Sequence, residues 1–222
     1  MGKDSSGCAR GSRPDRVCRK LSQADCGKQE EGGSLKRKRW EVRLAGQGGQ
    51  GLGLAGIILA EAAVRDGKNA VMTHSYGAQQ RGGPSRADVV ISNERIDYPQ
   101  VLDADVLVIF CEAAFDRYHH RLASDGFLVV DSSQARRSLV EGARSIPLPF
   151  ADIAQQVTGS IISANMVALG FVAELTKLVS RRALVGALRK HSPKDSLQAN
   201  QTALERGIQI AKSIKSGENW GH

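Results

Sequence analysis

The sequence has no apolar run approaching the roughly 18 residues that a membrane-spanning helix needs. Its N-terminus also lacks the apolar centre of a secretory signal peptide. At 222 residues, 41% of them hydrophobic, the chain is long enough to bury one ordinary core but too short for two large domains. We therefore expect a cytoplasmic protein with one domain and a tail, and no membrane partner.

Cysteine patterns that bind metals are missing as well. Cys8, Cys18 and Cys26 lie near the N-terminus with nine and seven residues between them, and no two cysteines form a CxxC pair. Structural zinc sites and iron–sulfur clusters use closer spacings, so the sequence disfavours both. Cys111 lies in the apolar run VLVIFCEAA, and we predict that it is a small buried hydrophobic residue.

Beyond its N-terminal segment the chain has little excess charge. The formal net charge is +8, but residues 1–39 hold eleven Lys and Arg against five Asp and Glu, whereas the remainder holds 20 basic against 18 acidic residues. A nearly neutral globular part lacks the basic surface with which proteins bind a nucleic-acid backbone. We therefore expect no nucleic-acid partner.

Composition divides the chain into three parts. Residues 1–39 are rich in Gly, Ser, Lys and Arg and have no strand or helix periodicity, so we predict a disordered basic tail. Residues 40–216 alternate strand-like and helix-like segments and form the predicted domain. Residues 217–222 form a second, short tail.

The predicted elements alternate along the domain. Strands are predicted at 40–46, 69–75, 87–93, 104–110 and 126–133, and the two prolines of residues 144–150 make that segment an edge strand or a loop. Helices are predicted at 52–67, 116–123, 151–157, 163–178, 180–190 and 197–214, with Ser163 and Ser180 as N-caps. This order predicts an α/β fold: a three-layer, Rossmann-like, mostly parallel sheet with helices on both faces and a helical C-terminal third.

A glycine-rich loop joins the first predicted strand to the first predicted helix. In GQGGQG, residues 46–51, the glycines satisfy G-x-G-x-x-G in the strand-to-helix setting that this pattern requires. Such glycines permit a tight turn and let phosphates approach the backbone, and the helix N-terminus offers N–H groups and a partial positive charge. The loop therefore predicts an anionic ligand, although glycines that only tighten the turn would satisfy the same pattern. Gln47 and Gln50 add amide donors that a purely structural turn would not require.

The carboxylate of a dinucleotide site is absent. NAD-binding folds place an Asp or Glu near the end of the second strand, about 20 residues after the loop, to bind the ribose. Here that strand ends Met72-Thr73-His74-Ser75, and Asp66 precedes the strand. This disfavours NAD.

A second unusual loop follows the second predicted strand. The stretch THSYGAQQRGGPSRAD, residues 73–88, comes after a strand of an α/β sheet, so it should share a rim with the glycine loop. Arg81 beside two glycines suits a phosphate or carboxylate, although a solvated loop arginine would look the same. No Ser, Cys or carboxylate forms a recognisable catalytic relay with His74 in the sequence, which disfavours a catalytic role for this histidine.

The two loops and the segments around them resemble a known family. The matching segments are GQGGQG with LAGIILAEAA, THSYGAQQRGGPSRADVVIS, the IDYP segment, ADVLVIFCEAAFDRY, GFLVVDSS, SANMVALGFVAELTKLVS and NQTALERGIQIA. In this order, from about Val42 to Ala211, they resemble the gamma subunit or gamma domain of the 2-oxoacid:ferredoxin oxidoreductases, which include the pyruvate, 2-oxoglutarate and indolepyruvate enzymes.

The resemblance implies one subunit of a hetero-oligomer that is not active alone. Enzymes of this family oxidatively decarboxylate a 2-oxoacid on thiamine diphosphate, pass electrons through iron–sulfur clusters to ferredoxin and release an acyl-CoA. This chain has neither the GDG and NN motifs that hold thiamine diphosphate and magnesium nor a cysteine set for a cluster. The resemblance therefore assigns those groups to partner alpha and beta subunits and a ferredoxin-like delta subunit.

In this family the gamma domain lies beside the thiamine site and its glycine loop helps to hold coenzyme A, a nucleotide that needs no carboxylate at the strand end. The resemblance thus implies coenzyme A as the ligand of this chain and no catalytic residue in it. Asn165 is expected to fix its helix N-terminus or to pack at an interface. The predicted phosphate-facing loop is Gly46, Gln47, Gly48, Gly49, Gln50 and Gly51, and the predicted adjoining wall is Thr73, Ser75, Tyr76, Gly77, Arg81, Gly82 and Gly83.

Two other functions stay open at the level of the sequence. The chain could be a free-standing nucleotide- or CoA-binding protein, or an NAD(P)-dependent oxidoreductase. A subunit should expose a large apolar patch for its partners, whereas a free-standing binding protein should not.

Overall fold

The computed structural model describes residues 38–76, 83–136, 140 and 143–216. The predicted tails, residues 1–39 and 217–222, lie outside the described residues except for Lys38 and Arg39. Arg39 already belongs to the first strand, so the domain begins one residue before the predicted boundary.

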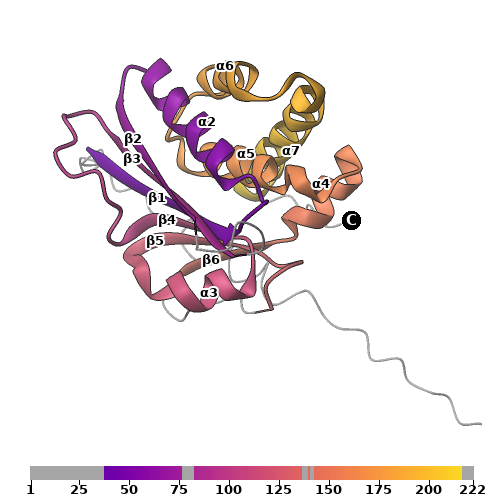
Figure 1. Ribbon diagram of the computed structural model, residues 1–222, viewed down its shortest axis with the longest axis horizontal. Helices are drawn as coiled ribbons and strands as arrows, with labels where there is room; N and C mark the ends of the chain where they lie inside the picture. Colours follow the sequence, from indigo (N-terminus) through magenta and orange to yellow (C-terminus); the bar gives the residue numbers. More distant parts are fainter. Residues whose placement is uncertain (1–37, 77–82, 137–139, 141–142, 217–222) are drawn as a thin grey trace, which may run out of the picture. The chain divides into compact units, whose positions relative to one another are not determined.

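Six strands form one sheet in the order β2-β3-β1-β4-β5-β6 (Figure 1). Their bounds are β1 Arg39–Gln47, β2 Asn69–Tyr76, β3 Pro84–Ser92, β4 Ala104–Ile109, β5 Leu122–Asp131 and β6 Arg144–Leu148. Strands β1, β4, β5 and β6 are parallel, whereas β3 runs antiparallel to both β1 and β2. The sheet is therefore mixed, because the short connection between β2 and β3 can close a hairpin but is too short for a parallel crossover. Strand β6 is an edge strand, which accommodates Pro147.

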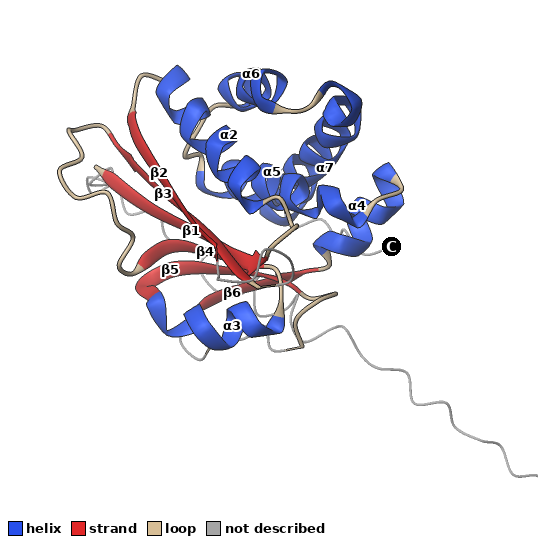
Figure 2. Cartoon of the chain, in the orientation of Figure 1, coloured by secondary structure: helices blue, strands red, loops and turns tan. Residues whose placement is uncertain are grey.

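The helices divide unequally between the two faces of the sheet (Figures 1 and 2). Helices α2, α4, α5, α6 and α7 lie on one face, and α3 lies on the other. Their bounds are α2 Leu52–Arg65, α3 Glu112–Tyr118, α4 Phe150–Thr158, α5 Ala164–Thr176, α6 Arg181–His191 and α7 Leu197–Ser216, with 3-10 turns at His119–Arg121, Ile161–Ser163 and Lys194–Ser196. The predicted α/β fold with helices on both faces and a helical C-terminal third is confirmed.

The position of α3 differs from its prediction at 116–123. The helix starts as soon as β4 ends, because the Cys111 carbonyl accepts hydrogen bonds from the N–H groups of Ala114 and Phe115, both at 3.1 Å. It also ends earlier, and Leu122 begins β5. The prediction left out the first turn of α3, residues 112–115, because the sequence EAAF continues the apolar run of the strand before it.

One of the two predicted N-caps is present. The Ser180 hydroxyl accepts a hydrogen bond from the Ala183 N–H at 3.1 Å at the start of α6. Ser163 precedes α5 without capping it, because a 3-10 turn leads directly into that helix. The Ser160 hydroxyl caps this turn by accepting from the Ile162 N–H at 3.3 Å.

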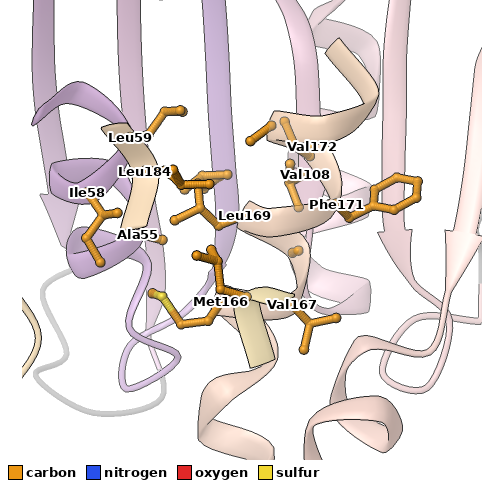
Figure 3. Packing of buried hydrophobic residues seen from close by; sticks show 14 of the residues in the cluster. Ala55, Ile58, Leu59, Val108, Met166, Val167, Leu169, Phe171, Val172 and Leu184 are labelled. Carbon is orange, nitrogen blue, oxygen red and sulfur yellow. The ribbon is translucent and has the colours of Figure 1, made fainter. Parts of the chain in front are cut away.

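Two hydrophobic clusters, one on each face, bury the sheet. In β4, Val106 and Val108 belong to the larger cluster under α2 and α5, part of which Figure 3 shows around Val108. The alternate residues Leu107 and Ile109 belong to the cluster under α3. This alternation confirms the prediction of a strand buried on both faces. Cys111 is buried as predicted. None of the described helices has the length and apolarity to cross a bilayer.

Candidate functional site

The glycine loop and the second predicted loop meet at one rim of the sheet. Because β1 and β2 are both antiparallel to β3, their C-terminal ends lie at the same edge, where Gln47 pairs with Pro84 and Tyr76 with Ser85. The N–H of Gly48 donates a 2.8 Å hydrogen bond to the carbonyl of Gly83. The predicted shared rim is therefore confirmed.

The side chain of Gln50 holds the glycine loop in shape. Its Oε1 accepts a hydrogen bond from the Gln47 N–H at 2.7 Å, and its Nε2 donates to the Phe110 carbonyl at 3.3 Å. Both ends of the amide are thus engaged within the protein. The expectation that a structural turn would not require this glutamine is wrong for Gln50, whereas the side chain of Gln47 is exposed at the rim.

The glycines of the loop differ in backbone conformation and in the space that a side chain would have. Gly49 and Gly51 have φ values of +99° and +69°, in the left-handed region that side chains disfavour. A Cβ at Gly46 would collide with the Gln50 side chain, and one at Gly51 would collide with Asn165. Gly48 has no positive φ. Backbone conformation therefore favours glycine at Gly49 and Gly51, and a side chain at Gly46 would require the Gln50 amide to move.

The start of α2 keeps backbone donors for an anion. Gly51 occupies the N-cap position, where it supplies no capping side chain, and the first turn contains no acidic residue. The N–H groups of Leu52, Gly53 and Leu54 have no acceptor within the helix, since the first intrahelical bond runs from the Ala55 N–H to the Gly51 carbonyl at 3.1 Å. With the helix dipole, these donors favour a negatively charged group at the loop.

Asn165 ties helix α5 to the glycine loop. Its Nδ2 donates a 2.9 Å hydrogen bond to the Gly51 carbonyl, and its Oδ1 is buried without a hydrogen-bond partner in the described part of the chain. The sequence suggested that Asn165 fixes its own helix or an interface. Its observed contact is 114 residues away along the chain, which no local pattern could indicate.

The predicted wall residues Thr73 and Ser75 lie on the face of the sheet opposite α2. Thr73 and Ser75 pair with Asp88 and Arg86 and line a cleft on the α3 face, away from α2. His74, between them, faces α2 instead, where a Cβ at Gly53 would come within 2.9 Å of its ring. The backbone of Tyr76 lies at the rim next to the buried Gly83. The other predicted wall residues, Gly77, Arg81 and Gly82, lie outside the described residues.

His74 packs under helix α2 as a partly buried imidazole. Its Nε2 lies 3.2 Å from the Oγ of Ser85, on the neighbouring strand. Burial lowers the pKa of His74 from its ordinary value, because desolvation disfavours the charged ring. The neutral imidazole therefore prevails near pH 7, and its contact with Ser85 links β2 to β3.

An exposed apolar pair lies in the turn that leads into α5. Ile161 and Ile162 are 57% and 67% exposed. They precede Asn165, which contacts the glycine loop, by three or four residues. Exposed large apolar side chains of this kind are suited to contact with another protein surface.

Comparison with known proteins supports these observations. Residues 41–210 match the family described as pyruvate ferredoxin/flavodoxin oxidoreductase. The chain is 38% identical over 181 residues to the 2-oxoglutarate synthase subunit KorC of Methanocaldococcus jannaschii, an alignment that covers 80% of this chain and 97% of that subunit.

Solved structures agree. The keto/oxoacid ferredoxin oxidoreductase gamma subunit of Geobacter sulfurreducens has a TM-score of 0.69 and 35% identity, covering 78% of this chain and 99% of that one. The 2-oxoglutarate:ferredoxin oxidoreductase of Magnetococcus marinus, solved with 2-oxoglutarate, coenzyme A and succinyl-CoA bound, has a TM-score of 0.72 and 27% identity, covering 80% of this chain and 32% of that chain. The chain therefore belongs to the pyruvate ferredoxin/flavodoxin oxidoreductase family and is a gamma subunit of a 2-oxoacid:ferredoxin oxidoreductase.

Proposed function

We propose that this subunit helps to hold coenzyme A at the glycine loop of a 2-oxoacid:ferredoxin oxidoreductase complex, which converts a 2-oxoacid to an acyl-CoA. The observation that carries the proposal is the uncapped start of α2, which directs backbone N–H groups toward the rim of the sheet. The complex of the related Magnetococcus enzyme with coenzyme A and succinyl-CoA supports this choice of ligand.

The geometry of the loop fits the phosphates of coenzyme A. Gly49 is exposed, and a Cβ added there would meet no atom of the described residues within 4 Å, which supports access of a ligand to this part of the loop. The first-turn N–H groups of α2 suit the pyrophosphate, whose charge the helix dipole favours. The loop carries no carboxylate that would repel this charge.

The chemistry of the complex lies on other chains in this proposal. Thiamine diphosphate supplies the carbanion stabilisation that decarboxylation needs. Within the described ranges, no three His, Cys, Asp or Glu side chains are placed to hold a metal ion. We assign thiamine diphosphate, magnesium and the iron–sulfur clusters to alpha, beta and delta partners, because this sequence has neither the GDG and NN motifs nor a closely spaced set of cysteines, and ferredoxin is the electron acceptor of the whole complex.

The first test is reconstitution. The tagged chain is co-purified with its partner subunits, and reduction of a redox dye that depends on both 2-oxoacid and coenzyme A is measured with and without this subunit. We expect activity only in the complete complex. Equal activity without this chain would contradict the proposed role.

The second test isolates the loop. Gly48→Val adds a side chain to the loop at a position that has no positive φ. Gly186→Val is the matched control, since Gly186 lies on α6, has no positive φ, and the atoms nearest to a Cβ there belong to the flexible Arg65 side chain. By calorimetry on the assembled complex, with circular dichroism to check that both variants are folded, we expect Gly48→Val to weaken coenzyme A binding about tenfold or more, equivalent to at least about 1.4 kcal/mol, and Gly186→Val to leave it unchanged. Unchanged affinity in Gly48→Val would leave the loop with a structural role alone.

A further inference from the structure

A cleft of about 530 Å³ lies on the face of the sheet opposite α2. It is formed by β1, β2 and β3, the segment 100–102 before β4, the C-terminal end of α3 and the 3-10 turn that follows. We call it the basic cleft and define it by Thr73, Ser75, Arg86, Arg117, His120 and Arg121, above the buried Arg43 and Asp88. None of the residues of the glycine loop lines it.

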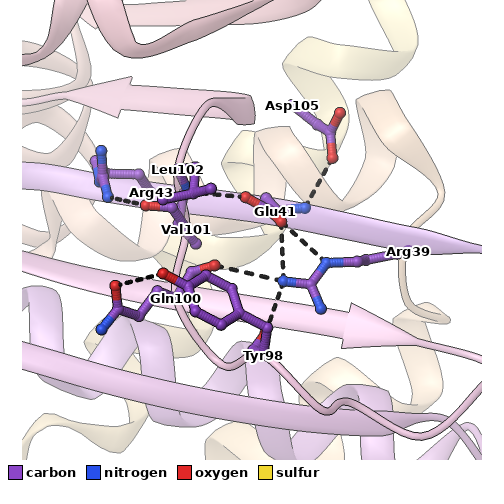
Figure 4. Close-up of polar contacts among 8 residues, drawn as sticks. All are labelled: Arg39, Glu41, Arg43, Tyr98, Gln100, Val101, Leu102 and Asp105. Atoms are coloured by element: carbon purple, nitrogen blue, oxygen red, sulfur yellow. Dashed lines mark hydrogen bonds and ion pairs between the residues drawn. The ribbon is translucent and has the colours of Figure 1, made fainter.

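The charges that line the basic cleft do not balance. Four arginines and one carboxylate line it. That carboxylate, Asp88, accepts two hydrogen bonds from Arg43, at 2.7 and 2.9 Å, and the side chains of both residues are about 95% buried. Arg43 also donates to the Val101 carbonyl at 2.7 Å (Figure 4). Asp88 and Arg43 thus neutralise each other in the floor of the cleft.

Two of the remaining arginines, Arg86 and Arg117, lie against the ring of Tyr118. Arg86 lies 3.6 Å from Asp88, longer than a hydrogen bond, and its side chain is partly exposed. The guanidinium carbons of Arg86 and Arg117 lie 5.8 and 5.6 Å from the centre of the Tyr118 ring, and that of Arg43 lies 5.3 Å from it. The buried ring therefore gathers cationic groups that would otherwise repel one another. Arg121 is exposed at the same cleft.

The remaining lining groups are suited to an oxyanion. Thr73 and Ser75 bring hydroxyl groups from the edge strand, and His120 brings an imidazole. Guanidinium groups form paired hydrogen bonds with phosphate oxygens, and hydroxyls complete the shell of such a group. The volume is sufficient for a phosphate-bearing metabolite.

We propose that the basic cleft binds the phosphate group of a small molecule, at a site separate from the glycine loop. Two sources share this chemistry: the 3′-phosphate of coenzyme A and an independent phosphorylated metabolite. Thr73 and Ser75, which the sequence placed on the coenzyme wall, belong to this second site.

Binding is measured by calorimetry with inorganic phosphate and pyrophosphate, at constant ionic strength, on the full-length chain and on the assembled complex. The test variants are Arg117→Gln and Arg121→Gln, both of which lie on the surface and leave the core intact. Arg95→Gln is the matched control, because it removes the same charge from a residue whose side chain is 91% exposed and lies outside the cleft. Gly48→Val reports separately on the glycine loop.

We expect each test variant to weaken phosphate binding at the basic cleft about tenfold or more, as for loss of a hydrogen bond to a charged group. Arg95→Gln should bind as the parent does, and Gly48→Val should keep the binding event that Arg117→Gln and Arg121→Gln lose. Coenzyme A and its 3′-dephospho form then identify the source. If Arg121→Gln weakens binding of coenzyme A but not of the dephospho form, the cleft holds the 3′-phosphate; if neither changes, it holds a separate metabolite, and either result supports the site.

Four results would overturn the proposal. The first is the absence of phosphate binding to the parent chain. The second is equal binding by the parent and both test variants. The third is loss of binding in Gly48→Val alone, which would place the phosphate at the glycine loop. The fourth is binding to the isolated chain that disappears in the complex, which would make the cleft a contact with an acidic partner surface.

Discussion

Replacing Asp88 by asparagine should destabilise the protein strongly. The variant keeps the shape of the side chain but removes the charge that Arg43 faces inside the sheet, where both side chains are about 95% buried. Breaking a buried ion pair by removing one partner costs about 3–5 kcal/mol, because the remaining charge is left uncompensated. For a domain of this size each kcal/mol lowers Tm by about 2–4 °C, so we expect Tm to fall by about 6–20 °C.

Thermal melting followed by circular dichroism measures this change. Asp97→Asn is the control, since Asp97 pairs with Arg95 at 3.2 Å and both side chains are more than four-fifths exposed, and it should melt as the parent does. The double variant Arg43→Met with Asp88→Leu should recover much of the loss, because it removes both buried charges. A Tm for Asp88→Asn within about 2 °C of the parent would refute the reasoning that this pair is desolvated.

Three further predictions concern packing, capping and pH. Gly207→Ala should destabilise strongly in thermal melts because its Cβ would collide with the Val167 backbone in α5, whereas Gly186→Ala, whose Cβ meets only the flexible tip of Arg65, should be neutral or stabilising; equal effects would contradict this difference. Ser180→Ala should cost about 1 kcal/mol in chemical denaturation by removing the N-cap of α6, and an unchanged midpoint would show that the cap contributes nothing. Burial lowers the pKa of His74 in the folded protein below its ordinary value of 6.5, so the unfolded chain binds the proton more readily than the folded one. The free energy of unfolding should therefore fall as the pH falls below 6.5 toward the lowered pKa. His74→Gln should therefore lose less Tm than the parent between about pH 7.5 and about pH 5.5, and an equal loss would refute the role of this histidine.

Local patterns predicted the elements well. The glycine loop and its neighbours β1 and α2 follow from an apolar run, a turn and an apolar helix face, all of which lie within one continuous segment. The edge position of β6 follows from Pro147, which has no N–H to donate. Ser180 was recognisable as an N-cap because capping depends on residues only three positions apart.

Contacts between distant segments were not predictable in this way. Apolar alternation in β3 is the same for parallel and antiparallel neighbours, so the hairpin and the mixed sheet did not follow from it. The approach of Asn165 to Gly51 and the pairing of Arg43 with Asp88 depend on how α5 and β3 pack against β1 and α2. The sequence did hold a signal for the pairing of Arg43 with Asp88, since each of these two opposite charges lies between apolar neighbours within its strand.

The Gly48 N–H already donates a hydrogen bond to the Gly83 carbonyl, so a ligand that used this N–H would compete with that carbonyl. A phosphate oxygen that used the Gly48 N–H would have to displace the Gly83 carbonyl, which then would need a new donor in water. Exchanging this bond costs about 0.5–1.5 kcal/mol, a small part of the affinity for a nucleotide. Binding of a ligand to the loop would therefore alter the contact between the loop and the residue before β3. The rate of amide hydrogen exchange at Gly48 should then change with coenzyme concentration.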